Sequence, residues 1–232
     1  MTTGSRWART ALVTTTFALL TALAPAIGDA TAQPAARCSR GVVALTFDDG
    51  PRPATTRPIL KFLIKHHLPA TFFMIGEQVA GHRRLLHRMH RHGFRVANHT
   101  FRHQDLTTLS AHQIRSTLRH TNRAIRRAGL RSPHLMRPPY GAIDDHARRV
   151  IRDLGMVPVL WTIDSRDWDG RSADEIVRSV LGQLHRGPNT VLLHDGVANS
   201  NQTRAALPRL IRGVRHHGYC FTALNRHGVP RT

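Results

Sequence analysis

The sequence predicts an α/β protein built on parallel strands. Seven short segments rich in apolar residues alternate along the chain with segments of helical periodicity. No internal repeat or low-complexity linker interrupts this alternation. Alternation of this kind implies parallel strands joined by right-handed crossovers. The pattern by itself fits either an open sheet or a barrel.

The N-terminal segment has the features of an export signal. Arg6 and Arg9 supply positive charge, residues 11–27 are mostly apolar, and Ala30-Thr31-Ala32 is a small-x-small cleavage site. A transmembrane anchor is the alternative, but the apolar stretch is short and diluted by threonines. We therefore expect residues 1–32 to be a cleaved signal peptide, residues 33–232 to form one domain, and the protein to be secreted or cell-wall associated.

Strands in the first half of the chain are short apolar runs bounded by glycine or proline. They are expected at 42–45, 70–74 and 94–97, with Gly50-Pro51, Pro69 and Gly93 as the chain-breaking residues. Helices are expected where apolar residues recur at three- and four-residue spacing, at 56–67, 77–92 and 110–128. Ser110 caps the third helix and Gly129 ends it. Residues 98–109 are a polar loop.

The second half of the chain continues the same alternation. Strands are expected at 134–137, 156–163, 190–194 and 219–222, and helices at 143–154, 172–184 and 203–217. Pro138-Pro139 ends the first of these strands, Gly155 ends the first helix, and Ser172 caps the second helix. The run 156–163 is strongly apolar and is expected to form one continuous strand.

Charge is the most unusual bulk property of the chain. Lys and Arg number 34 against 14 Asp and Glu, a net charge of +20, and Lys61 and Lys65 are the only lysines. Such a field attracts polyanions, including nucleic acid, acidic wall polymers and anionic lipid. The charges are scattered, however, and no aromatic-interleaved basic platform or nucleic-acid motif is present. We expect no specific nucleic-acid partner, and a basic exported polyanion-binding protein without turnover remains an alternative.

The chain has two cysteines, Cys38 and Cys220. In an exported protein an even pair most simply forms a disulfide, and two unpaired buried thiols are the alternative. Cys38 precedes the first expected strand and Cys220 lies in the last one. In a closed or nearly closed barrel those strands are neighbours, so a bridge would join the seam.

Polar residues gather where the expected strands end. Asp48-Asp49, His99, Arg137, residues 164–167 and His194 all lie at or just after the carboxyl ends of strands. In a parallel barrel these ends form one rim, where active sites are built. Adjacent carboxylates are costly unless a metal or a shared proton separates their roles, although an Asp-rich turn is the simpler reading of Asp48-Asp49 alone.

His99 and His103 are four residues apart in the polar loop. On a helical turn they would share one face and could chelate one ion. The chain has 17 histidines, so pairs at this spacing also arise by chance. With one carboxylate they would leave coordination positions open, which indicates a catalytic metal with zinc as leading candidate. Non-haem iron oxygenases use the same ligand set, so the ligand count does not choose between them.

Five segments, taken in order, resemble the motifs of the polysaccharide deacetylases, carbohydrate esterase family four. They are Thr46–Pro51, His99–His103, Arg137–Gly141, Asp164–Trp168 and Leu192–Asp195. The resemblance extends over essentially the whole chain after Arg40, and no catalytic position is broken. It implies a distorted (β/α) barrel with seven parallel strands, in agreement with the strand count above.

The resemblance also implies a role for each residue of the rim. Asp49, His99 and His103 would hold a divalent metal, Zn²⁺ first, with Co²⁺, Mn²⁺, Ni²⁺ or Fe²⁺ as alternatives. The metal would lower the pKa of a bound water to about 7. The other implied roles are Asp48 as general base, Arg137 as the partner that keeps it ionised, the backbone N–H of Tyr140 as oxyanion donor, His194 as general acid, and Asp167 as its orienting carboxylate.

Three further residues of the motifs have less defined roles. Trp168 either walls the pocket of the general acid or is a plain core tryptophan. Asp164 and Asp195 would support the site or the fold.

The implied activity is removal of acetyl from N-acetylglucosamine units of peptidoglycan or chitin-type oligosaccharides, and the positive charge favours an anionic wall glycan. O-deacetylation of acetylated xylan is the alternative within the same enzyme class. An iron oxygenase would need a 2-oxo acid or oxygen, and nothing in the sequence indicates one. We expect a monomer that acts on a polysaccharide or oligosaccharide and has no membrane span after signal cleavage.

Overall fold

The computed structural model describes residues 1–2 and 38–232. Residues 38–232 belong to one unit of the chain. The expected signal peptide, residues 1–32, lies almost entirely outside the described residues. Among those that are described, no helix is both long enough and apolar enough to cross a membrane.

Parallel strands form the centre of the fold. The strands are β1 (Gly41–Gly50), β2 (Ala70–Met74), β3 (Arg95–Asn98), β4 (Leu135–Met136), β5 (Val157–Pro158), β6 (Ile163–Asp164), β7 (Gly187–His194) and β8 (Tyr219–Phe221). Seven of them follow one curled path, in the order β5-β4-β3-β2-β1-β7-β6, and β8 pairs with the start of β1. Every pairing between these strands is parallel. The expected distorted (β/α) barrel is confirmed.

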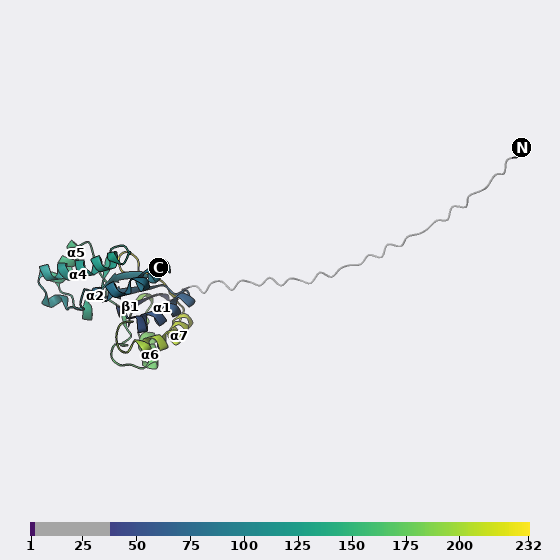
Figure 1. Ribbon diagram of the computed structural model, residues 1–232. Coiled ribbons are helices and arrows are strands. Elements are labelled where there is room, and N and C mark those ends of the chain that lie inside the picture. Colours follow the sequence, from purple (N-terminus) through teal and green to yellow (C-terminus); the bar gives the residue numbers. More distant parts are fainter. Residues whose placement is uncertain (3–37) are drawn as a thin grey trace. The chain divides into compact units, whose positions relative to one another are not determined.

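Helices follow the strands as expected. They are α1 (Pro53–Lys65), α2 (Gly76–Val79), α3 (Arg83–Arg91), α4 (Ala111–Arg127), α5 (Asp145–Asp153), α6 (Ala173–Gln183) and α7 (Ser200–His216), with short 3₁₀ turns η1 (Ala80–His82), η2 (Leu106–Thr108) and η3 (Pro139–Gly141). In Figure 1, α1, α6 and α7 lie together on one side of β1, whereas α4 and α5 lie together on the other. The helix expected over 77–92 is divided into α2, η1 and α3.

Strand β1 positions the site because its two faces meet different surroundings. Val43, Leu45 and Phe47 pack in the cluster beneath the outer helices, and Ala44 packs in the cluster inside the barrel. Side chains alternate between the faces of a strand. Thr46 and Asp48 therefore share the inner face with Ala44, and both are buried.

The prediction of a single strand over residues 156–163 was wrong. β5 pairs with β4, and β6 pairs with β7, so the run crosses the open side of the barrel between its two ends. The ladder to β4 ends with the N–H of Val159, which donates to the carbonyl of Met136 at 2.8 Å. The carbonyls of Val159 and Leu160, which lie in the crossing, accept hydrogen bonds from Arg137 instead.

The disulfide expected between Cys38 and Cys220 is present. Cys220 lies in β8, opposite Val42 of β1, and Cys38 lies just before β1. The bridge therefore joins the chain segment that enters β1 to the last strand.

Candidate active site

A bulge at the end of β1 aims two adjacent carboxylates into the same space. In the β1–β2 register Asp48 faces Phe73 and Gly50 faces Met74, so Asp49 is an extra residue. Asp49 has a φ of 70°, in the left-handed region. Neighbouring residues of a regular strand point to opposite faces, and a bulge re-aims one of them. The bulge therefore explains how both carboxylates reach the rim.

The two histidines of the second motif are brought together by a tight turn and not by a helical one. His99 follows β3 directly, and Thr100 and His103 have φ values of 62° and 55°. Asn98 Oδ1 accepts a hydrogen bond from the N–H of Thr100 at 2.8 Å. The hydroxyl of Thr117 on α4 accepts one from the N–H of Phe101 at 2.9 Å. These bonds hold a strained turn that the four-residue spacing does not reveal.

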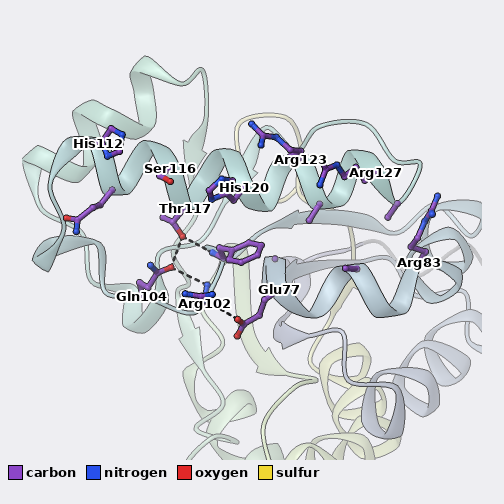
Figure 2. Close-up of a pocket in the computed structure, with 16 residues that line it drawn as sticks. Glu77, Arg83, Arg102, Gln104, His112, Ser116, Thr117, His120, Arg123 and Arg127 are labelled. Carbon is purple, nitrogen blue, oxygen red and sulfur yellow. Dashed lines mark hydrogen bonds and ion pairs between the residues drawn. The ribbon is translucent and has the colours of Figure 1, made fainter.

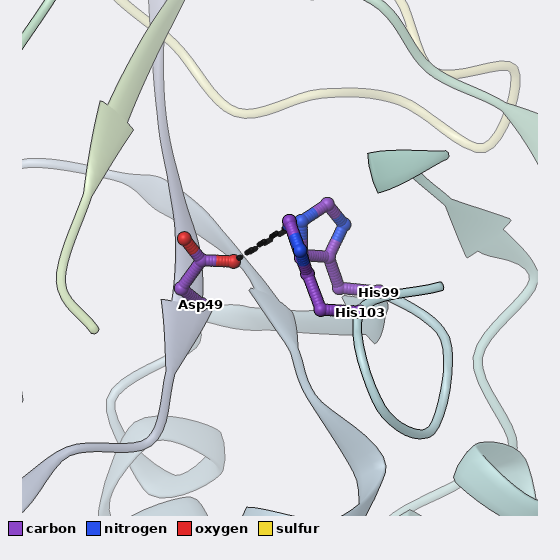
Figure 3. Close-up of side chains that lie close together, drawn as sticks. All are labelled: Asp49, His99 and His103. Carbon is purple, nitrogen blue, oxygen red and sulfur yellow. Dashed lines mark ion pairs between the residues drawn. The ribbon is translucent and has the colours of Figure 1, made fainter. Parts of the chain in front are cut away.

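Asp49, His99 and His103 form a candidate metal centre. Oδ1 of Asp49 lies 3.3 Å from Nε2 of His99 and 3.3 Å from Nε2 of His103. Figure 3 shows the carboxylate at the end of β1 facing both imidazole rings. One ligand atom from each residue lies within 4.8 Å of the others.

The donor set fits a divalent cation. Nδ1 of His99 lies 2.8 Å from the carbonyl oxygen of Arg137, so Nδ1 carries the proton and Nε2 presents its lone pair to the centre. Oδ1 of Asp49 is buried and accepts no hydrogen bond from the described residues. A buried anionic oxygen without a donor is costly unless a cation satisfies it.

Electrostatics at the centre agree with this fit. Burial alone raises the pKa of Asp49, but the nearby imidazoles of His99, His194 and His103 outweigh it, and the pKa lies below its ordinary value. Burial lowers the pKa of His103 by more than the charge of Asp49 raises it. The carboxylate is therefore ionised and the imidazole neutral at neutral pH, the forms that bind metals.

Asp48 is held apart from this centre by Arg137. Nη1 of Arg137 donates to Oδ1 of Asp48 at 2.8 Å and to the hydroxyl of Thr46 at 2.8 Å. Oδ2 of Asp48 lies 3.7 Å from Nε2 of His99 and accepts no hydrogen bond from the described residues. One oxygen of Asp48 is thus paired and the other is free to accept a proton.

Burial and packing immobilise the guanidinium of Arg137. The side chain is fully buried, with its guanidinium carbon 4.2 Å from the centroid of the Phe73 ring. Nε donates to the carbonyl of Val159 at 3.1 Å and Nη2 to that of Leu160 at 3.4 Å. Burial lowers the pKa of Arg137, and the charge and hydrogen bond of Asp48 oppose that effect.

Tyr140 presents a backbone donor beside the candidate metal centre. Pro138 and Pro139 precede it, and Tyr140 itself has a φ of 60° in the short turn η3. Its N–H has no acceptor among the described residues, whereas the N–H groups of Gly141 and Ala142 bond back to the two prolines. The Tyr140 ring packs edge-on against His103, with centroids 4.6 Å apart. An unused N–H in this position can donate to a ligand oxygen.

His194, the last residue of β7, forms a buried pair with Asp167 in the loop after β6. Nδ1 of His194 lies 2.6 Å from Oδ1 of Asp167. The other oxygen of Asp167 accepts from the N–H of His194 at 2.8 Å and from the hydroxyl of Thr203 at 2.7 Å. Burial by itself lowers the pKa of His194, but the hydrogen bond and charge of Asp167 outweigh it and raise the pKa to about 9. At neutral pH the imidazole therefore carries a proton that Nε2 can donate.

Three polar residues of the site were missed by the sequence reasoning or left without a defined role. Thr46 bridges Arg137 and β7, since its hydroxyl donates to the carbonyl of Val191 at 2.6 Å. Thr203 on α7 holds Asp167. Asp195 is fully buried, and its N–H donates to the carbonyl of Asp48 at 3.0 Å. Thr46 lies within the first motif and could have been suspected, whereas Thr203 is an unremarkable residue of an amphipathic helix.

Asp195 and Trp168 support different parts of the rim. Burial raises the pKa of Asp195 to about 7, although the hydroxyl of Thr56, which donates to its carboxylate, opposes that effect. Trp168 is half exposed, and its indole N–H donates to Asp164 at 3.4 Å. Trp168 is therefore not a core residue.

A parallel barrel that gathers a candidate metal centre, a free carboxylate oxygen and a protonated histidine on one rim has the architecture of a hydrolytic enzyme. Comparison with known proteins identifies the family. Residues 36–159 match the polysaccharide deacetylase family model. The chain belongs to that family and is a hydrolase, as the resemblance of its five motifs predicted.

Individual relatives agree with this family assignment. A chitooligosaccharide deacetylase of Sinorhizobium fredii is 38% identical over 193 residues, which cover 78% of this chain and 89% of the relative. A peptidoglycan-N-acetylglucosamine deacetylase of Bacillus cereus is 32% identical over 186 residues, 79% of this chain and 86% of the relative. The family 4 carbohydrate esterase from Streptomyces lividans, solved in complex with acetate, superposes with a TM-score of 0.75 at 35% identity, covering 83% of this chain and 97% of that one.

Proposed function

We propose that this chain is a secreted, metal-dependent deacetylase that hydrolyses the N-acetyl group of N-acetylglucosamine units in peptidoglycan or chitin-type oligosaccharides. The observation that carries the proposal is that three sets of side chains with different chemistry surround one space. Asp49, His99 and His103 converge at its centre, with Asp48 paired to Arg137 and His194 paired to Asp167 beside them.

Water activation is the first step. Asp49, His99 and His103 would hold a divalent cation, Zn²⁺ being the leading candidate, and when bound it supplies Lewis acidity that acidifies water and polarises a carbonyl. The free Oδ2 of Asp48 takes the proton as water adds to the acetyl carbonyl carbon. Arg137 holds the other oxygen of Asp48, so the carboxylate is oriented before substrate arrives.

The remaining residues stabilise and resolve the tetrahedral intermediate. The N–H of Tyr140 donates to the oxyanion, because it has no competing acceptor. His194 donates its Nε2 proton to the amide nitrogen as the C–N bond breaks, and acetate and a free amine result. A departing amine needs that proton more than a departing alkoxide does. The raised pKa of His194 keeps this proton in place at neutral pH, as hydrolysis of an N-acetyl substrate requires.

The sequence and the relatives support the proposed location and substrate class. The features of residues 1–32 are those of a cleaved signal peptide, which would place the enzyme outside the cytoplasm. The two relatives described above are named for chitooligosaccharides and for peptidoglycan N-acetylglucosamine. The net charge of +20 favours an anionic wall glycan as the natural polymer.

The test is acetate release from peptidoglycan, chitooligosaccharide and acetylxylan, measured side by side with one enzyme preparation. We expect release from at least one N-acetyl substrate, loss of activity on chelation, and recovery on adding Zn²⁺ or another divalent ion. Release from acetylxylan alone would replace the proposal with an O-deacetylase. Activity that survives complete metal removal would reject the metal centre.

A further inference from the structure

A cavity lies outside the group of catalytic residues. It has a volume of about 820 Å³ and is lined by α4 on one side and by α2, η1, the start of α3 and part of the histidine loop on the other. Gly76 permits this close approach, since a Cβ there would come within 2.6 Å of the Phe101 ring and of the Thr121 hydroxyl. Asp48, Asp49 and His194 do not line it. We call it the α2–α4 groove.

One face of α4 forms a continuous wall of the groove. The lining positions recur every three or four residues, which is the spacing of a single helical face: His112, Ser116, His120, Arg123 and Arg127. The helix runs from Ala111 to Arg127, a length of about 25 Å. In Figure 2 these side chains extend along α4, with Arg83 opposite on α3 and Glu77 and Arg102 below. The groove is long enough to hold a segment of an extended chain.

The lining is strongly cationic and mostly unpaired. It contains Arg83, Arg102, Arg123 and Arg127 but a single acid, Glu77, which pairs with Arg102 at 3.2 Å. The other three arginines have no acidic partner within residues 38–232. Guanidinium groups bind carboxylates and phosphates in a bidentate manner, and a concave site focuses their field.

The rest of the lining suits sugar rings. Phe101 supplies an aromatic ring, which packs edge-on against His120 with centroids 5.8 Å apart. The side-chain oxygens of Gln104 and Gln113 are engaged by Thr117 and Ser110, but their amide nitrogens donate to no described residue. An aromatic surface with a few unused amide donors is the lining expected where a polar ring compound binds.

We propose that the α2–α4 groove binds an acidic glycan chain. Arg83, Arg123 and Arg127 contact its carboxylates, and Phe101 and the free glutamine amides contact its sugar rings. Such a site holds the enzyme on a negatively charged polymer while the rim acts on acetyl groups. The groove adds a binding function to the deacetylase, and binding to it requires neither turnover nor a metal.

The test is isothermal titration of the secreted protein with three probes: a carboxylated oligogalacturonide, a neutral chitooligosaccharide and inorganic polyphosphate. The groove variant is Arg83→Gln/Arg127→Gln. The matched control is Arg84→Gln/Arg126→Gln, which removes two exposed charges one residue away on the same helices but outside the groove. We expect the groove variant to lose about tenfold in affinity for oligogalacturonide, and the control to stay within about twofold of the unmodified protein.

Each other outcome overturns the proposal. Equal losses in both variants would show a diffuse charge effect, and no loss in either would place the ligand elsewhere. Polyphosphate that binds as tightly as oligogalacturonide, with the same loss in the groove variant, would show an anion site without sugar recognition. Because no reaction is measured, failure of the deacetylation assay leaves this result unaffected. Circular dichroism of both variants checks that they are folded.

Discussion

Nη1 of Arg137 lies 2.8 Å from Oδ1 of Asp48, and both side chains are buried. Asp48 ends the inner face of β1, and Arg137 follows β4, so the pair joins two strands that are not neighbours in the sheet. The same arginine donates to the carbonyls of Val159 and Leu160, where the barrel is open. One side chain thus serves both the fold and the candidate general base.

Replacing Arg137 by Met should lower the free energy of unfolding by about 3–5 kcal/mol, because Asp48 is left as an uncompensated buried charge. Urea denaturation with the disulfide intact measures this. The double variant Arg137→Met/Asp48→Asn should recover part of the loss, since no charge then remains to be paired. A double variant as unstable as the single one would show that the ion pair contributes little.

Variants of the two adjacent carboxylates should differ in how much metal they retain. Asp49→Asn removes the negative charge from the group whose Oδ1 faces both Nε2 atoms at 3.3 Å, so the purified variant should bind metal weakly. Asp48→Asn should retain metal and lose activity, because Oδ1 is held by Arg137 and only the proton acceptor is lost. Elemental analysis by mass spectrometry of both variants is the measurement. Metal missing from Asp48→Asn and present in Asp49→Asn would reverse the assignment.

His194→Ala should discriminate between amide and ester substrates. General acid catalysis is worth about 10²–10⁴ in rate, and an amine must be protonated as it departs. We expect most of that loss in kcat/KM on an N-acetyl sugar and a distinctly smaller loss on an activated acetyl ester. Metal content should stay unchanged, which is the control. Equal losses on the two substrates would assign His194 a different task.

The loss of activity at alkaline pH, the alkaline limb of the activity profile, should depend on Asp167. A general acid works only while protonated, so activity is present below the pKa of His194 and is lost as pH rises through it. The raised pKa of His194, about 9, is an upper bound for the limb, since a bound cation would offset the smaller contributions of Asp48 and Asp49. Removing the charge in Asp167→Asn lowers this pKa, and the limb should move to lower pH.

The measurement is kcat/KM against pH for the unmodified enzyme and the variant. Asp169→Asn is the matched control, because Asp169 lies on the same loop but is exposed and pairs with Arg166. Its alkaline limb should coincide with that of the unmodified enzyme. A limb that stays in place in Asp167→Asn would mean that another group sets it.

Loss of the Cys38–Cys220 bridge should destabilise the domain without disturbing the rim. The bridge spans 182 residues, and the chain-entropy estimate for so long a loop is about 5 kcal/mol, which is an upper value. Cys38→Ser/Cys220→Ser should therefore unfold at lower urea concentration while keeping its kcat/KM under native conditions. Two free thiols in the non-reduced unmodified protein, detected by mass spectrometry, would contradict the bridge.

The local sequence pattern was sufficient to predict the alternation of strands and helices and to locate the motif residues that follow the strands. Apolar periodicity reports which faces of a segment are buried, and glycine, proline and capping residues report where the segment ends. The Ser110–Gln113 capping box, for example, marks the start of α4 in the sequence and in the structure. Adjacent polar residues such as Asp48 and Asp49 could likewise be assigned to one rim, because parallel strands bring their carboxyl ends together.

By itself, then, the sequence determined the class of fold, the cysteine pair and the set of rim residues. Only the tertiary structure decided how they meet. The run 156–163 breaks because its two ends pair with different strands, β4 and β7, and its apolar residues would look the same in one strand. The left-handed turn at Thr100 and His103, and the hydrogen bond from Thr203 to Asp167, depend on contacts between segments remote in the chain. Periodicity reports burial along a segment and carries no distance between segments, so those relationships arise only when the barrel assembles.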